Sequence, residues 1–308
     1  MPSHVRSILQ ALFVTFLWST SVILIKTGLE TLPPLTFAGL RYSLAFVFLL
    51  PLALRTSRRG MTARLTRADW RRLIALGLVM YTLTQGAQFV ALDYLPPATH
   101  SMMLNGTSAV VLVFGTVWLA EHPTRLQIAG ITVFFAGIAL YFAEADFSGT
   151  QMIGLAVATF QVFANAAAAV LGRFVNRTAT LSPLLITTIS MGVGAAMLIV
   201  AALFTQGVPQ LGVGEIALIV WLAGINTAFA FTLWNHTQRT LSAMESSMIN
   251  STMLIQIGAL AWIFLGDALS IREVAGMLLA AAGILLVQVR RLRRAPRPSL
   301  TQTTDQPA

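Results

Sequence analysis

The segment from Tyr94 to Phe142 occurs a second time in this chain, 146 residues later and without a gap. The copies are clearest where TVWLAEHPTRLQIAGITVFFAGIAL starts at Thr116 and WIFLGDALSIREVAGMLLAAAGILL starts at Trp262. A shorter match, LPPL at Leu32 and LSPL at Leu181, extends the repeat toward the start of each half. The chain therefore contains two copies of one helical unit, each more than about a hundred residues long.

The composition places both units in a lipid bilayer. Of the 308 residues, 56% are hydrophobic and only 10% are charged, and the mean hydropathy is +0.76. A soluble domain of this size carries about 25% charged residues. Apolar runs of about twenty residues, the length that crosses the hydrocarbon core of a bilayer, recur from end to end. We therefore expect an all-α, polytopic membrane protein.

Proline and glycine breaks divide the apolar runs into ten predicted transmembrane helices, five in each half. Their expected ranges are 7–27, 35–54, 70–92, 98–119, 125–143, 150–172, 182–204, 213–235, 241–265 and 271–290. The first repeat then covers residues 1–147 and the second covers residues 148–290. We expect residues 291–308 to form a basic, disordered cytoplasmic tail.

Charged residues orient the predicted bundle. If the N-terminus is cytoplasmic, 17 of the 20 basic residues lie inside and 7 of the 11 acidic residues lie outside. This asymmetry follows the positive-inside rule and puts both termini in the cytoplasm, most simply across a bacterial inner membrane. The net charge of +9 is thus a topology signal. The expected surroundings are the lipid bilayer, and no nucleic-acid partner is implied.

An odd number of helices in each repeat decides the architecture. A five-helix unit that is repeated in sequence enters the membrane from opposite sides in its two copies, so the repeats are inverted. Inverted repeats are typical of secondary transporters, with the substrate site near the bilayer midplane between the halves. The pattern therefore predicts a transporter of a small-molecule substrate.

Several short motifs carry a resemblance to a known family. Trp18-Ser19 is followed by Lys26 in the first span, and the second span opens with LTFAGLR from Leu35. The turn-and-helix pattern LAE followed by QIAG and GI, which ends in Ile138, returns as LGD, AG and GI in the second half. Together these motifs resemble the EamA type of the ten-helix drug/metabolite transporter superfamily over residues 7–290. The second copy departs from the pattern at two places. It has Asp267 where Glu is usual, and its first span has Phe160-Gln161 where a Trp is usual.

The resemblance implies a secondary transporter, most often an exporter of amino acids or other small metabolites, that works by alternating access. Other solutes carried within the superfamily, namely drugs, phosphorylated sugars and nucleotide sugars, form the alternative. Carriers of phosphorylated solutes need several Lys or Arg side chains around the phosphate. Because Arg41 is the one basic residue that lies away from the ends of the predicted spans, a neutral or zwitterionic solute is favoured.

Polar side chains inside predicted spans mark the candidate substrate path, because such groups usually face the bundle interior or a water-filled cavity. Tyr81, Gln85 and Gln88 share one helix face, and so do Ser101 and Asn105 in the next span. The alternative is a structural role, since Asn and Gln also join membrane helices by hydrogen bonds. The candidate substrate-binding residues are Trp18, Ser19, Tyr81, Gln85, Gln88, Ser101, Asn105, Gln161, Asn165, Asn226, Trp234 and Asn250.

Two residues are candidates for a charge or proton role. Arg41 lies about two turns inside its span. It is either a counter-charge for an anionic group or a side chain that snorkels or pairs within the helix, with Glu30 or a backbone carbonyl as the partner. No acidic residue falls in the middle third of a predicted span. His100 is therefore the one candidate for proton coupling, and uniport or exchange is the alternative.

The repeat also predicts structural roles for its glycines and its turn acids. Gly130 and Gly137 recur as Gly276 and Gly283 and should allow close helix packing. The acidic residues of the two equivalent turns, Glu121 and Asp267, are each followed three residues later by a hydroxyl residue, Thr124 or Ser270, and this pattern should cap the helices that follow.

Other function classes lack support in the sequence. No Walker, HExxH or GxSxG motif is present, so no enzyme is indicated. A channel or a membrane-embedded receptor is a further alternative, although a channel usually places charge rings or a carbonyl filter around its pore. The chain has no cysteine and its four histidines have no metal-ligand spacing. We expect no cofactor, no metal and no obligate protein partner.

Overall fold

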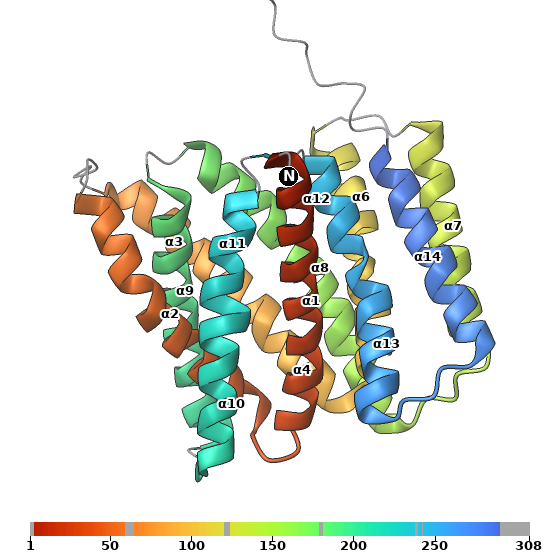
Figure 1. Cartoon of the computed structure of the whole chain (residues 1–308), viewed down its shortest axis with the longest axis horizontal. Coiled ribbons are helices and arrows are strands. Elements are labelled where there is room, and N and C mark those ends of the chain that lie inside the picture. Colours follow the sequence, from red (N-terminus) through yellow and green to blue (C-terminus); the bar gives the residue numbers. More distant parts are fainter. Residues whose placement is uncertain are drawn as a thin grey trace, which may run out of the picture.

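The computed structural model describes residues 3–58, 65–119, 124–178, 181–207, 209–237, 240–241 and 243–289, and their regular structure is helical throughout (Figure 1). The expected tail at 291–308 and the turn residue Glu121 lie outside these residues. In the first half the helices are α1 (Ser3–Gly28), α2 (Pro34–Arg58), α3 (Arg67–Gly77), the π-helix η1 (Leu78–Gln85), α4 (Gly86–Tyr94), α5 (Pro97–Asn105), α6 (Thr107–Leu119) and α7 (Arg125–Tyr141).

The second half contains the same kinds of element in the same order. Its helices are α8 (Gly149–Thr178), α9 (Pro183–Thr205), α10 (Val213–Ala223), the π-helix η2 (Gly224–Phe229), α11 (Ala230–Thr237), α12 (Ala243–Ser251), α13 (Met253–Leu265) and α14 (Ile271–Val289). Many boundaries differ by the same 146 residues as the sequence repeat. Such pairs are the starts of α3 and α10, η1 and η2, α5 and α12, and α7 and α14.

Within the described residues, seven helical segments are long and apolar enough to cross a membrane. They are His4–Gly28, Pro34–Arg55, Arg67–Tyr94, Gly149–Asn176, Pro183–Thr205, Val213–Trp234 and Met248–Leu265. The other three predicted spans fall on interrupted or shorter helices. Gly106 separates α5 from α6, α7 runs only from Arg125 to Tyr141, and α14 reaches Val289 at the end of the described residues.

The two halves pack against each other along several helix pairs. α2 lies against α9, α7 against α14, and α1 against α11 and α13. The largest buried cluster joins both halves, and Phe37 of α2 meets Phe89 of α4 edge-on within it, with ring centroids 5.1 Å apart. α7 and α14 run side by side at one edge of the molecule (Figure 1).

Glycine brings α7 and α14 into backbone contact. A Cβ atom at Gly137 would lie 2.5 Å from the backbone nitrogen of Ala280 and 2.7 Å from the carbonyl oxygen of Gly276. A Cβ atom at Gly130 would lie 2.7 Å from the carbonyl oxygen of Gly283. No side chain fits between these backbones. The expectation that the four repeated glycines allow close helix packing is confirmed.

Two long helical segments are interrupted at equivalent residues of the repeat, and the shorter helices on either side of the interruptions pack unequally against one another. Gly106 separates α5 from α6, and Thr252 separates α12 from α13, with nearly the same backbone angles at both positions. α5 packs against α13. The corresponding pair, α6 and α12, makes no comparable contact within the described residues. In Figure 1, α6 and α12 lie toward the end of the molecule that carries the N-terminus.

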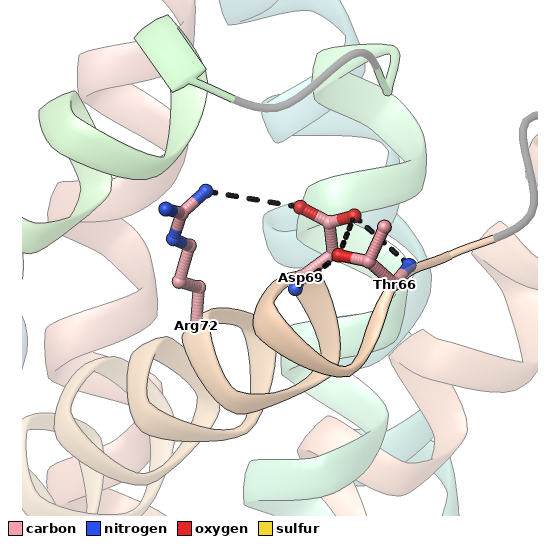
Figure 2. A network of polar contacts seen from close by, with 3 residues as sticks. All are labelled: Thr66, Asp69 and Arg72. Carbon is pink, nitrogen blue, oxygen red and sulfur yellow. Dashed lines mark hydrogen bonds and ion pairs between the residues drawn. The ribbon is translucent and has the colours of Figure 1, made fainter.

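Side-chain caps fix where several helices begin. At α3, the Asp69 carboxylate accepts hydrogen bonds from the Thr66 backbone (3.0 Å) and hydroxyl (2.7 Å), and Arg72 lies 3.8 Å from its other oxygen (Figure 2). Thr124 and Ser270 cap α7 and α14, each with a partner three residues later. Of the two residues in the pattern predicted at α14, Ser270 forms the cap, and the expectation that Asp267 takes part in it is wrong.

Candidate transport cavity

A cavity of about 410 Å³ lies between the two halves and is lined by side chains from both. The lining residues are Trp18, Ser21, Val22, Arg41, Tyr42, Met80, Gln85, Gln88, His100, Ser101, Leu104, Asn105, Thr107, Ser108, Asn165, Phe231, Asn250, Ser251, Met253 and Ile257. Most of the polar groups are amides and hydroxyls. Within the described residues, no carboxylate lines the space. The volume falls in the range of small-molecule sites.

The structure brings most of the predicted site residues to this cavity. Those that line it are Trp18, Arg41, Gln85, Gln88, His100, Ser101, Asn105, Asn165 and Asn250. Ser19, Tyr81, Gln161, Asn226 and Trp234 do not line it. These five side chains lie one layer behind, where each packs against or bonds to a neighbouring residue.

Ser19 and Asn226 attach α1 to helices of the second half. The Ser19 hydroxyl lies 2.8 Å from the carbonyl oxygen of Thr15 and 2.9 Å from the side-chain oxygen of Gln256 in α13. The Asn226 amide donates to the carbonyl oxygen of Leu17. Both residues are fully buried. Their polar groups join helices, which is the structural alternative for such side chains.

Tyr81 and Trp234 support aromatic side chains that reach the cavity. Tyr81 meets Tyr42 edge-on, with ring centroids 5.6 Å apart. Trp234 packs against Trp18 at 5.1 Å, and Phe231 contacts the same ring at 5.4 Å. The Trp18 indole nitrogen is buried and has no hydrogen-bond partner in the described part of the chain.

Gln85 is the last residue of the first π-helix, and Tyr42 of α2 holds its side chain. The Tyr42 hydroxyl donates to the Gln85 side-chain oxygen at 2.7 Å. The Thr84 hydroxyl donates to the carbonyl oxygen of Val79, five residues earlier, as the wider turn of a π-helix allows. π-Turns inside helices are frequent at functional sites. Gln85 is therefore held at the cavity wall by a neighbour from α2.

His100 is buried at the cavity wall and is held by a residue of the second half. Its Nε2 atom lies 2.8 Å from the side-chain oxygen of Gln161 in α8. Its Nδ1 atom has no partner within the described residues. Gln161 thus acts on the orientation of His100, and its predicted role in direct substrate contact would require His100 to move.

The Arg41 side chain, from the first half, forms a hydrogen bond to a residue of the second half. Its Nε donates to the Thr227 hydroxyl at 3.0 Å, and that hydroxyl donates to the carbonyl oxygen of Leu222, which lies at the end of α10 just before η2. The guanidinium carbon lies 5.4 Å from the centre of the Tyr42 ring and 5.9 Å from that of Phe89. Within the described residues, Arg41 is paired with neither Glu30 nor a backbone carbonyl.

Sequence reasoning did not single out several lining residues, among them Tyr42, Met80 and Phe231. Tyr42 follows Arg41 directly, and both reach the cavity from one turn of α2. Met80 lies within η1, and Phe231 lies in α11 just after η2. The prediction considered mainly polar side chains within spans, so it did not include the apolar Met80 and Phe231.

Comparison with known proteins assigns the chain to a family. The model of the EamA-like transporter family matches residues 5–143 and again residues 152–289. A crystal structure with 18% sequence identity superposes with a TM-score of 0.67 and covers 94% of this chain and 99% of the other, which shows a shared fold. The chain belongs to the EamA-like transporter family. It is an integral membrane transporter and not an enzyme.

Full-length relatives carry transporter names. The "Uncharacterized transporter YvbV" of Bacillus subtilis is 26% identical over 92% of this chain and 92% of its own. A "Probable amino-acid metabolite efflux pump" of Salmonella typhimurium is 24% identical over 94% of this chain and 97% of its own. The similarity therefore extends across both halves.

Proposed function

We propose that this transporter exports or exchanges small neutral or zwitterionic solutes, such as aromatic or other amino acids, through the central cavity. The observation that carries the proposal is the lining, in which amides, hydroxyls and aromatic rings from both halves surround about 410 Å³. Such groups can bind a polar backbone and an apolar side chain together. The name of the Salmonella relative, a probable amino-acid metabolite efflux pump, supports the same solute class.

The proposed mechanism is alternating access between two inverted five-helix repeats, residues 1–147 and 148–290. The recurrence of helix boundaries after 146 residues and the two matches to the family model support this architecture. The unequal packing of α5–α13 and α6–α12 fits a state closed at one membrane face. Exchanging the roles of the halves would close α6 against α12 and open the other face.

We also propose that both termini face the cytoplasm of a bacterial cell and that the transporter lies in the inner membrane. The distribution of basic residues supports this orientation. With it, the closed α5–α13 contact lies at the outer face, so the cavity would take up solute from the cytoplasm. This direction agrees with export.

Counterflow into proteoliposomes tests the proposal. Purified protein would be reconstituted and offered a panel of radiolabelled neutral amino acids, with and without a pH gradient. We expect saturable exchange that is insensitive to the gradient. Transport that follows the gradient would instead assign proton coupling to His100. Transport of drugs or phosphorylated sugars but of no amino acid would contradict the proposed solute class.

A variant pair connects transport to the cavity. Gln85→Ala removes an amide from the cavity wall, and we expect altered transport kinetics with unchanged membrane insertion. Gln210→Ala, at an exposed position between α9 and α10, is the control and should transport like the wild type. Equal kinetics for all three proteins would exclude Gln85 from the path.

A further inference from the structure

Arg41 is a cation buried at the wall of the cavity. Only 5% of its surface is exposed, although it lies about two turns inside a membrane-spanning helix. Its Nε atom is used by Thr227 at 3.0 Å. Its two terminal nitrogens make no hydrogen bond within the described part of the chain, and neither is enclosed. Since Arg41 lines the cavity, these N–H groups are open to a bound solute.

Arg41 has no anionic partner within the described residues. The ion pairs found there are His4–Glu245, Arg72–Asp69 and Arg272–Glu144. The groups around the cavity are amides, hydroxyls, aromatic rings, apolar side chains and His100. The rings of Tyr42 and Phe89 stabilise a cation only weakly by comparison with a carboxylate. A buried, uncompensated cation is costly, and an arriving anion would remove that cost.

We propose that Arg41 binds the carboxylate group of the transported solute. The planar guanidinium presents parallel N–H donors, the geometry that suits a carboxylate. One guanidinium matches one negative charge, and no second Lys or Arg lines the cavity in the described residues. The proposal rests on the proposed function and makes it more specific: the solute must carry a carboxylate, while its amino group is met only by amide and hydroxyl oxygens.

The attachment of Arg41 places this recognition at the contact between the halves. Arg41 belongs to α2, whereas Thr227 lies in η2, and the Thr227 hydroxyl is itself held by Leu222. A carboxylate bound at the terminal nitrogens therefore sits on a side chain that both halves hold.

Ligand binding to the detergent-purified full chain tests the proposal without requiring transport. The probes are phenylalanine, phenylacetate (no amine), phenethylamine and phenylalaninamide (no carboxylate), with inorganic phosphate as a further anion. A ligand that binds the folded state raises the unfolding temperature. We expect phenylalanine and phenylacetate to raise it and the two probes without a carboxylate to have little effect.

Substitutions then assign the effect to Arg41. Arg41→Met should raise the dissociation constant of phenylacetate by about tenfold to a hundredfold, the usual value of hydrogen bonds to a charged group. Arg41→Lys, which keeps the charge but loses the planar fork, should be intermediate. Arg272→Gln, which alters an arginine paired with Glu144, is the control and should bind like the wild type.

The unliganded variants separate recognition from a structural role. If Arg41 serves recognition, unliganded Arg41→Met should unfold at the same or a higher temperature than the wild type, because it removes an uncompensated buried charge. A structural arginine would show a clear loss. Loss of folding in Arg41→Met, together with unchanged carboxylate binding in Arg41→Lys, would overturn the proposal.

The remaining outcomes distinguish this proposal from the proposed function. Equal binding of phenylalanine and phenethylamine, no binding of either carboxylate, or stronger Arg41-dependent binding of phosphate would each refute carboxylate recognition. Amino-acid transport unchanged in Arg41→Met would leave the proposed function intact and reject the role of Arg41. Arg41-dependent carboxylate binding without amino-acid transport would keep the role of Arg41 and reject the proposed solutes.

Discussion

The contact between α7 and α14 gives a specific prediction for stability, because the space between the two backbones cannot hold one added methyl group. In Gly137→Ala the new Cβ atom would lie 2.5 Å from the nitrogen of Ala280 and 2.7 Å from the oxygen of Gly276. Both are backbone atoms and cannot rotate away. The two helices must separate by about 1 Å to restore an ordinary contact of roughly 3.5 Å.

The size of the effect follows from that displacement. A gap of about 0.5–1 Å forfeits roughly a quarter to a half of each atom-pair attraction along the contact. Overpacking of this kind costs about 1–3 kcal/mol. We therefore expect Gly137→Ala to lower the unfolding temperature by about 5 °C, taking roughly 2–4 °C for each kcal/mol.

Thermal unfolding in detergent, with Gly214→Ala as the control, measures the effect. Gly214 lies in α10, and a Cβ atom there would meet nothing within 4 Å. Alanine at that position should be neutral or should stabilise by up to about 1 kcal/mol. Adding Gly276→Ala to Gly137→Ala should cost less than the sum of the single changes, since one separation of the helices serves both. Equal unfolding temperatures for Gly137→Ala and Gly214→Ala would refute the reasoning.

Three further predictions concern a helix cap, a loop carboxylate and the orientation in the membrane. Thr124→Ala removes the acceptor for the Gln127 backbone and should cost about 1 kcal/mol in thermal unfolding, whereas Thr124→Ser should cost little. Burial raises the pKa of the Asp267 carboxyl above its ordinary value of 3.8, so its ionised form opposes folding at neutral pH. Asp267→Asn should therefore be the more stable protein at pH 7, and its advantage should vanish as the pH falls below about 4; an advantage that grows at low pH would contradict this sign. Because the chain has no cysteine, Gln210→Cys should react with an impermeant maleimide in intact cells and Val5→Cys only after permeabilisation; the reverse pattern would invert the proposed topology.

Much of the helical organisation was predictable because hydrophobic length and glycine spacing act locally. The membrane character and the family were predicted from composition and short motifs. The glycine pairs were also predictable, since a small residue repeated every seven positions marks one face of a helix. The π-helices could not be predicted, because the wider turn that brings the Thr84 hydroxyl to the carbonyl oxygen of Val79, and the Thr227 hydroxyl to that of Leu222, depends on tertiary packing.

The candidate site was predictable by residue type but not by partner. Gln85 and Gln161 are alike as amides within spans, yet Gln85 lines the cavity while Gln161 holds His100. Sequence spacing assigns a side chain to a helix face, whereas its partner on another helix depends on how the two halves dock. The same limit applies to Asp267, since both it and Ser270 had the chemistry of a cap and only the geometry selected Ser270.

The interruptions at Gly106 and Thr252 divide two long helical segments near their midpoints. At Gly106 the backbone nitrogen bonds to Met103, three residues earlier, as the Thr252 nitrogen does to Ile249. A segment divided in this way can bend at one point while both of its ends stay helical. In the proposed alternating-access cycle the two ends could then move separately, which would permit an occluded intermediate in which both ends are shut around the solute. Such an intermediate would prevent leakage of water and ions during each transport cycle.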